Sequence, residues 1–175
     1  MQPMQTSYIV TFIGDDRPGL VEALSAAVEE NGGNWLESRL AQLAGKFTGL
    51  VRISLPREQG ASLELALKQL AESGLSVRVT EVADPLPAEH TGRNISLSVI
   101  GPDRPGIVRE IAHALSARLI NVVEMESGVS SAPMSAELLF QAEIVATIPE
   151  DADMLNLQES LEEIANHMAL DIELS

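Results

Sequence analysis

The chain has 175 residues, of which 45% are hydrophobic, 21% charged and only 3% aromatic, a composition typical of a globular protein with an aliphatic core. Its 11 Lys and Arg residues stand against 26 Asp and Glu, giving a net charge of −15 that repels phosphate backbones and anionic membrane surfaces. The absence of cysteine excludes disulfides, thiolate metal ligands and cysteine nucleophiles. With no signal-peptide pattern and no long apolar run, we expect a soluble cytoplasmic protein that binds neither nucleic acid nor membrane directly.

The first half of the chain alternates between strand and helix patterns in the order strand, helix, strand, strand, helix, strand. The predicted segments are residues 8–13, 20–30, 34–43, 47–55, 63–73 and 75–82. Asn31-Gly32-Gly33 is expected to end the first helix, Ser62 to cap the second, and Gly74 to close it. This order is that of the split βαβ, or ferredoxin-like, fold.

The second half repeats the first. The stretch Gly14-Asp15-Asp16-Arg17-Pro18-Gly19-Leu20-Val21 returns 87 residues later as Gly101-Pro102-Asp103-Arg104-Pro105-Gly106-Ile107-Val108. The later segments are predicted at residues 95–100, 107–118, from 121 onward, 138–148, 154–166 and 169–174. Between the second and third of the later strands, residues 128–135 are expected to form a mobile hairpin loop or lid, longer than the corresponding connection Ala44-Gly45-Lys46 of the first half.

Residues 84–94 contain Pro85, Pro87 and Gly92 without hydrophobic periodicity, as is typical of a linker. The predicted organisation is therefore one domain at residues 1–83, a linker at 84–94 and a second domain at 95–175. We predict the α+β class, with two ferredoxin-like (βαββαβ) domains, each built on an antiparallel sheet.

The repeated turn carries the strongest functional signal, because each copy leads from a strand into a helix. Asp16 and Asp103 are placed to accept a hydrogen bond from an amide at the helix start. Pro18 and Pro105 are tolerated there because their missing N–H would have no partner in the first helical turn.

Gly19 and Gly106 are predicted to lie inside that first turn, where glycine costs about 1 kcal/mol relative to alanine. Two interpretations fit. Either a small anionic ligand approaches the free amides and the positive end of the helix dipole, or the turn is a tight packing of helix on sheet. Local chemistry alone favours the packing interpretation, and it leaves Asn34 and Asn121 equally open to closing a turn or reaching a ligand.

Other chemistry lacks support. The three histidines have no spaced partners, the turn has no phosphate-loop glycine pattern, and no nucleophile–base pair is present. We expect no catalytic residue, no metal and no cofactor.

The unit βαββαβ, with Asp-Arg-Pro-Gly-Leu/Ile-Val after its first strand and Asn opening its second, resembles the ACT domain, a regulatory module that binds amino acids. The resemblance covers nearly the whole chain, twice. It implies binding where the first turn of one unit meets the second-strand region of a neighbouring unit. The residues selected are Gly14, Asp16, Pro18, Gly19, Leu20 and Asn34, and Gly101, Asp103, Pro105, Gly106, Ile107 and Asn121.

Two bare ACT units further resemble a family of ACT-type transcriptional repressors. This implies a non-enzymatic sensor of a small amino acid, with glycine as a candidate, that acts through a transcription-factor partner and forms a homodimer. Pro102, which stands where the first copy has Asp15, leaves open whether both turns bind. The alternative is a stand-alone ferredoxin-like enzyme or metal-binding protein.

Overall fold

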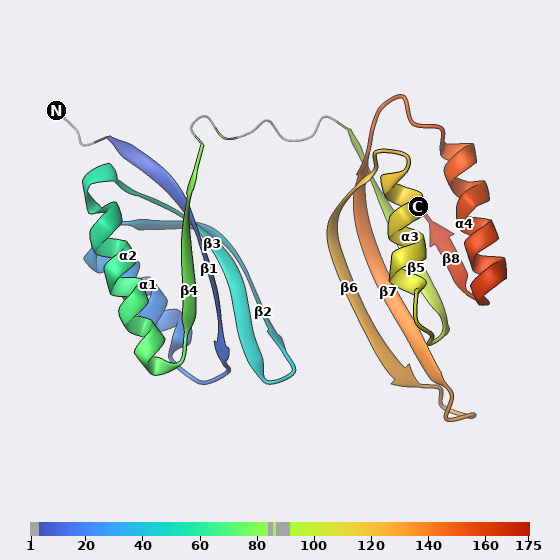
Figure 1. Cartoon of the computed structure of the whole chain (residues 1–175), viewed down its shortest axis with the longest axis horizontal. Coiled ribbons are helices and arrows are strands. Elements are labelled where there is room, and N and C mark those ends of the chain that lie inside the picture. The colour runs from blue at the N-terminus through green and yellow to red at the C-terminus, as the bar shows by residue number, and fades with distance from the viewer. Residues whose placement is uncertain (1–3, 84–85, 87–91) are drawn as a thin grey trace. The chain divides into compact units, whose positions relative to one another are not determined.

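The computed structural model describes residues 4–83, 86 and 92–175. The chain divides into two compact units, unit 1 (Met1–Pro87) and unit 2 (Ala88–Ser175). Each unit is a four-stranded antiparallel sheet with helices on one face, as Figure 1 shows. The predicted class, two ferredoxin-like domains with antiparallel sheets, is confirmed. The proposed linker at 84–94 falls mostly outside the described residues.

Unit 1 contains four strands, two helices and two short 3-10 helices. They are β1 (Gln5–Asp15), α1 (Leu20–Glu30), β2 (Asn34–Leu43), β3 (Lys46–Pro56), η1 (Arg57–Gln59), α2 (Gly60–Gln69), η2 (Leu70–Ser73) and β4 (Ser76–Val82). The sheet order is β2-β3-β1-β4, so that β2 and β4 are the edge strands.

Unit 2 repeats the arrangement with the order β6-β7-β5-β8. Its elements are β5 (Arg93–Pro102), α3 (Ile107–Ser116), β6 (Asn121–Ser131), β7 (Leu138–Ile148), α4 (Met154–Met168) and β8 (Asp171–Leu174). Both edge strands that follow the first helix carry a register irregularity at the same place, between Trp35 and Glu37 in β2 and between Val122 and Glu124 in β6.

Each unit has its own aliphatic core between sheet and helices. Alternate residues of the central strands point at the helices, for example Val10 and Phe12 in β1 and Leu97 and Val99 in β5, all at most 3% exposed. The opposite face of each sheet has no helix on it within the described residues, as Figure 1 also shows. Each unit is therefore a two-layer structure with one open sheet face.

Two local predictions are wrong. Ser62 does not cap α2, because the chain already turns helical at η1 and α2 begins at Gly60. Glycine is suited to that position because a Cβ there would lie 2.6 Å from the Tyr8 hydroxyl. The predicted loop at 128–135 is also too long, since β6 continues to Ser131 through pairing with β7, from Gly128↔Gln141 to Ser131↔Leu138.

Candidate functional site

The turn between β1 and α1 is built on a glycine in an unusual backbone conformation. Gly19 precedes the helix at its N-cap with φ 91°, and Gly106 does the same before α3 with φ 99°. The expectation that these glycines lie within the first helical turn is therefore wrong. Residues with a Cβ are strained in this left-handed region, so the backbone itself explains both glycines.

The space in front of Gly19 is open. A Cβ there would have no protein atom within 4 Å, and at Gly106 the nearest would be the Met168 Cε at 3.8 Å. Among the described residues no side chain caps either helix. The first amides of α1 and α3, together with the positive end of each helix dipole, are consequently directed at open space, which suits an anionic group.

Asp16 does not cap α1 as predicted. Its carboxylate instead accepts a hydrogen bond from the Gln42 amide of β2, and its backbone N–H donates to the Gly45 carbonyl over 3.0 Å. In unit 2 the Asp103 N–H donates in the same way to the Leu138 carbonyl over 2.8 Å. Each turn is thus fastened to the hairpin beside it.

Charged neighbours of the first turn are exposed and paired. Asp15 forms an ion pair with Lys46, whose hydrogen bond and positive charge lower the pKa of the Asp15 carboxyl. The Arg17 guanidinium donates to the Ser73 carbonyl over 2.7 Å. Pro102 replaces Asp15 in unit 2, so only the first turn carries this ion pair.

Gly14 and Gly101 have a packing role. A Cβ on Gly14 would lie 2.9 Å from Leu75 Cδ1, and a Cβ on Gly101 would lie 2.8 Å from the Ala169 carbonyl oxygen. These glycines allow the end of the first strand to approach the segment that leads into the last strand.

The remaining turn residues divide into exposed and buried positions. Pro18 and Pro105 are exposed, whereas Leu20 and Ile107 are only 5% and 2% exposed and belong to the two cores. The side chains of Leu20 and Ile107 therefore anchor the helix starts, and only their backbone faces the turn.

Within one unit the structure does not bring Asn34 to the turn. Asn34 pairs with Ser54, which pairs with Ser7, whereas Gly14 pairs with Phe47 further along the same strands. Seven residues of strand correspond to about 23 Å. Asn121 is separated from Gly101 in the same way, since its row runs through Thr147 to Asn94.

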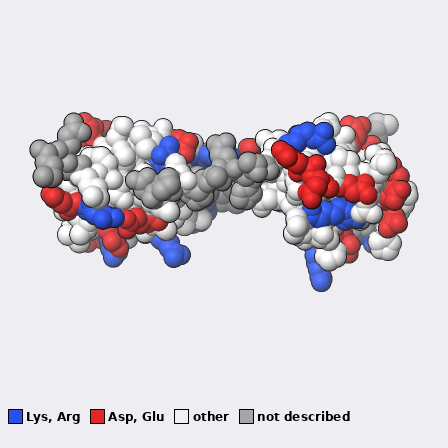
Figure 2. All heavy atoms as spheres, turned by 90° about the horizontal axis from the view of Figure 1, so that it is seen from above, with Lys and Arg blue, Asp and Glu red and all other residues white. Residues whose placement is uncertain are grey.

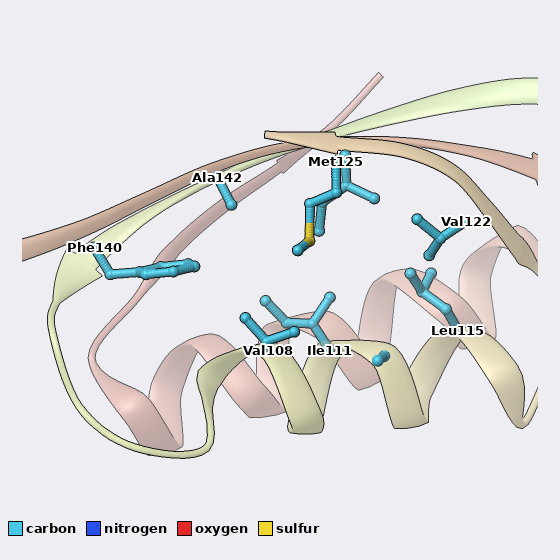
Figure 3. A pocket seen from close by; sticks show the side chains of 9 residues that line it. Val108, Ile111, Leu115, Val122, Met125, Phe140 and Ala142 are labelled. Atoms are coloured by element: carbon cyan, nitrogen blue, oxygen red, sulfur yellow. The ribbon is translucent and has the colours of Figure 1, made fainter. Parts of the chain in front are cut away.

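Unit 2 also contains an apolar hollow that the sequence did not predict. It lies between α3 and the strands β6 and β7, and Figure 3 shows Val108 and Ile111 of the helix facing Met125 of β6. It is lined by Val108, Ile111, Ala112, Leu115, Val122, Met125, Phe140, Ala142 and Ile144. Its volume of about 20 Å³ has room for about one water molecule, so an amino acid does not fit inside.

Within residues 4–83, 86 and 92–175 there is no group of three or more His, Asp or Glu side chains placed to hold a metal ion. In that same part of the chain, none of the helices has the length and apolar character required to cross a membrane.

Comparison with known proteins agrees with this architecture. The ACT domain family model matches residues 6–80 and again residues 94–175. The chain therefore belongs to the ACT domain family and carries two copies of the domain.

The chain also resembles one particular kind of ACT protein. It is 25% identical over 162 residues to the glycine cleavage system transcriptional repressor of Escherichia coli K12, an alignment covering 91% of this chain and 84% of the relative. A crystal structure of an unknown protein from Galdieria sulphuraria superposes with a TM-score of 0.86 at 27% identity, covering 98% of both chains. A putative glycine cleavage system transcriptional repressor shares the fold with a TM-score of 0.72 at 20% identity, covering 98% of this chain and 97% of the other.

Proposed function

We propose that this chain is a non-enzymatic regulatory protein that senses a small amino acid, with glycine as the first candidate, and controls transcription in the cytoplasm through a partner protein. Two observations support the proposal. ACT domains generally bind small amino acids, and the relative aligned over nearly the whole chain is a transcriptional repressor. The observation that carries it is the pair of uncapped helix starts behind Gly19 and Gly106.

In the proposed site the ligand carboxylate faces the amides of the helix start, where the dipole favours negative charge. The ammonium group is held by nearby oxygens of the turn. Asn34 and Asn121 would come from a neighbouring unit, because within one unit they lie at the far end of the sheet. The proposed ligand residues are Gly14, Asp16, Pro18, Gly19, Leu20 and Asn34 for one turn, and Gly101, Asp103, Pro105, Gly106, Ile107 and Asn121 for the other.

The partner is expected to be a protein rather than DNA. Binding to a duplex rests on several Lys or Arg contacts to phosphates, and a net charge of −15 opposes them. A gel-shift titration of the pure protein at low salt should show no sequence-specific binding. Specific binding below micromolar concentration would contradict the requirement for a partner.

A thermal-shift screen against the amino acids tests the sensing function. Ligand at about 100 times its dissociation constant stabilises the fold by about 2.7 kcal/mol, enough to raise the melting temperature by a few degrees. We expect glycine or another small amino acid to give this shift. If no amino acid does so at millimolar concentration, the turns are only helix starts and the proposal fails.

Variants then locate the binding turn. Asparagine tolerates the left-handed conformation better than other residues with a side chain, so Gly19→Asn and Gly106→Asn keep the backbone and fill the space in front of the amides. We expect each to remove the ligand shift of its own turn. Gly32→Asn is the matched control, because Gly32 also has a positive φ, 75°, but follows the other end of α1. A double variant of Gly19 and Gly106 that responds like the parent would contradict the site.

A further inference from the structure

The open sheet faces of the two units carry opposite charges at corresponding positions. In unit 1 one row across the sheet runs through Arg39, Leu50, Thr11 and Arg78 on β2, β3, β1 and β4. In unit 2 the row at the corresponding register runs through Glu126, Glu143, Ser98 and Glu173 on β6, β7, β5 and β8. The two arginines at the edges of the first row are thus replaced by two glutamates, and the leucine by a third.

The face of unit 1 around this row is basic with an apolar centre. Its basic residues are Arg39, Lys46, Arg52 and Arg78, and its acidic residues are Asp15 and Glu37. Arg52 is bound to Glu37 over 2.7 Å. Leu50 is 47% exposed in the middle of the face, beside a hollow bordered by Arg39 and Arg52. An acidic surface with an aliphatic centre would complement this face in charge and polarity.

The corresponding face of unit 2 is acidic. It carries Glu124, Glu126, Glu143, Asp171 and Glu173, and within the described residues no Lys or Arg lies on it. The side of this unit that is visible in Figure 2 carries many acidic side chains together with several Lys and Arg. Glu126 stands directly opposite Glu143, an arrangement of like charges that destabilises a sheet until a cation lies nearby.

We propose that the basic sheet face of unit 1 docks onto the acidic sheet face of unit 2 of a second copy of this chain. The argument is charge complementarity at matching register, which brings Arg39 and Arg78 against the glutamates of the other row. Reciprocal pairing of two copies uses both faces of each chain and closes the assembly with two-fold symmetry. This inference is independent of amino-acid sensing and stands if that proposal fails.

The size of the faces agrees with this partner. Strands about 4.8 Å apart and about seven residues long, with the four-residue β8 at one edge of unit 2, give a four-stranded face of roughly 400 Å² of flat area. A single pair of faces would bury about 800 Å², which is typical of weak contacts, whereas the reciprocal dimer buries about 1,600 Å², the size of a stable interface.

The test measures the oligomeric state of the full chain by light scattering and sedimentation. We expect the parent to be a dimer at low salt and to weaken as salt rises to about 1 M, where the Debye length falls to about 3 Å. The variant Arg39→Glu/Arg78→Glu makes both faces acidic, and Glu126→Arg/Glu143→Arg/Glu173→Arg makes both basic. Each variant alone should have a dissociation constant raised by at least about 100-fold.

Mixing the two variants gives the decisive result. An acidic face of one variant then meets a basic face of the other in both contacts, so an equimolar mixture should form a heterodimer while each component alone stays monomeric. The matched controls Lys68→Glu on α2 and Glu159→Arg on α4 reverse charges on exposed helix positions and should leave the parent dimer unchanged.

Three results would each overturn the proposal. The parent could be monomeric at low salt, either charge-reversed variant could dimerise on its own, or the mixture of the two variants could stay monomeric. Circular dichroism checks that the reversed variants are folded. Should one of them unfold, the neutral variant Arg39→Gln/Arg78→Gln replaces it, and dimerisation as tight as in the parent would then be the contradicting result.

Discussion

The edge strand that follows the first helix is part of the core in unit 1 and stands outside it in unit 2. In β2, Trp35 and Leu40 pack against the core, whereas every residue of β6 is exposed. Val122 occupies the register position of Trp35, and Ser127 that of Leu40. In unit 1, Leu40 covers Gly49 so closely that a Cβ on this glycine would lie 2.4 Å from Leu40 Cδ2.

The apolar hollow of unit 2 lies where the side chains of the two units differ. Ser127 stands beside Ala142, where unit 1 has Leu40 beside Gly49, and the hollow is lined by Ala142 and Val122. The two copies thus keep the same strand register and the same irregularity near the strand start, while the side chains that close the layer differ.

The largest effect is expected from giving unit 1 the residue of unit 2. Trp35→Val removes most of a side chain that packs on the core, and should lower the free energy of unfolding by about 2–3 kcal/mol. Val122→Ala, the control at the corresponding exposed position, should cost less than about 1 kcal/mol. Urea unfolding followed by circular dichroism measures both, and equal losses would show that β2 and β6 contribute alike.

The next largest effect is expected at a feature that the two units share, the left-handed glycine before the first helix. Gly19→Ala and Gly106→Ala should each cost about 1–2 kcal/mol, because the strain lies in the left-handed backbone and neither Cβ meets a close neighbour. Thermal unfolding without ligand measures the cost. If one variant loses much more unfolding free energy than the other, the two turns are not equivalent, and the added Cβ meets a neighbour at that turn.

A smaller gain is expected from giving unit 2 the residue of unit 1. Ser127→Leu places an aliphatic side chain beside Ala142 at the rim of the hollow and should stabilise unit 2 by up to about 1 kcal/mol. Ser130→Leu, on the other face of the same strand, is the control and should bring no gain. A destabilised Ser127→Leu variant would show that the hollow cannot accept the added group.

The smallest effect concerns acid stability. The Asp15 carboxyl has a pKa below the ordinary 3.8 because of its hydrogen bond to Lys46 and that side chain's charge. A lowered pKa in the folded state contributes stability above pH 3.8, and the contribution is lost as the pH falls through the folded value. Asp15→Asn should therefore flatten the pH dependence of unfolding slightly in this acidic range. Pro102→Asp should not introduce the same dependence in unit 2, because Lys46 has no counterpart beside it.

Sequence reasoning located most elements because strong local signals agree with the fold. The ranges predicted for β2 and β7 match the structure, since apolar patterning and the turn at Gly45 act together. The length of β6 escaped prediction because Gly128, Ser130 and Ser131 have low strand preference, and pairing with β7 overrides it. The start of α2 was not predicted because the reason for a glycine at residue 60 is the close approach of the Tyr8 hydroxyl, which is distant in sequence.

For the candidate site, the repeat alone identified both turns. The positive φ of Gly19 and Gly106 could not be read from spacing, because a glycine one position inside a helix and one at its cap look the same in a sequence. The hollow depends on which residues of β6 face Ala142 across the sheet, and such long-range register is not visible in any local window.

The irregularities in β2 and β6 have a consequence for behaviour at high concentration. Leu36 and Val123 are the residues without a partner in their ladders, and each interrupts the regular row of N–H and C=O groups along an outer strand. An interrupted edge is a poor template for a flat incoming strand. We therefore expect the edge strands β2 and β6, ten and eleven residues long with exposed Val, Leu and Met, to be poor sites for continuous strand addition.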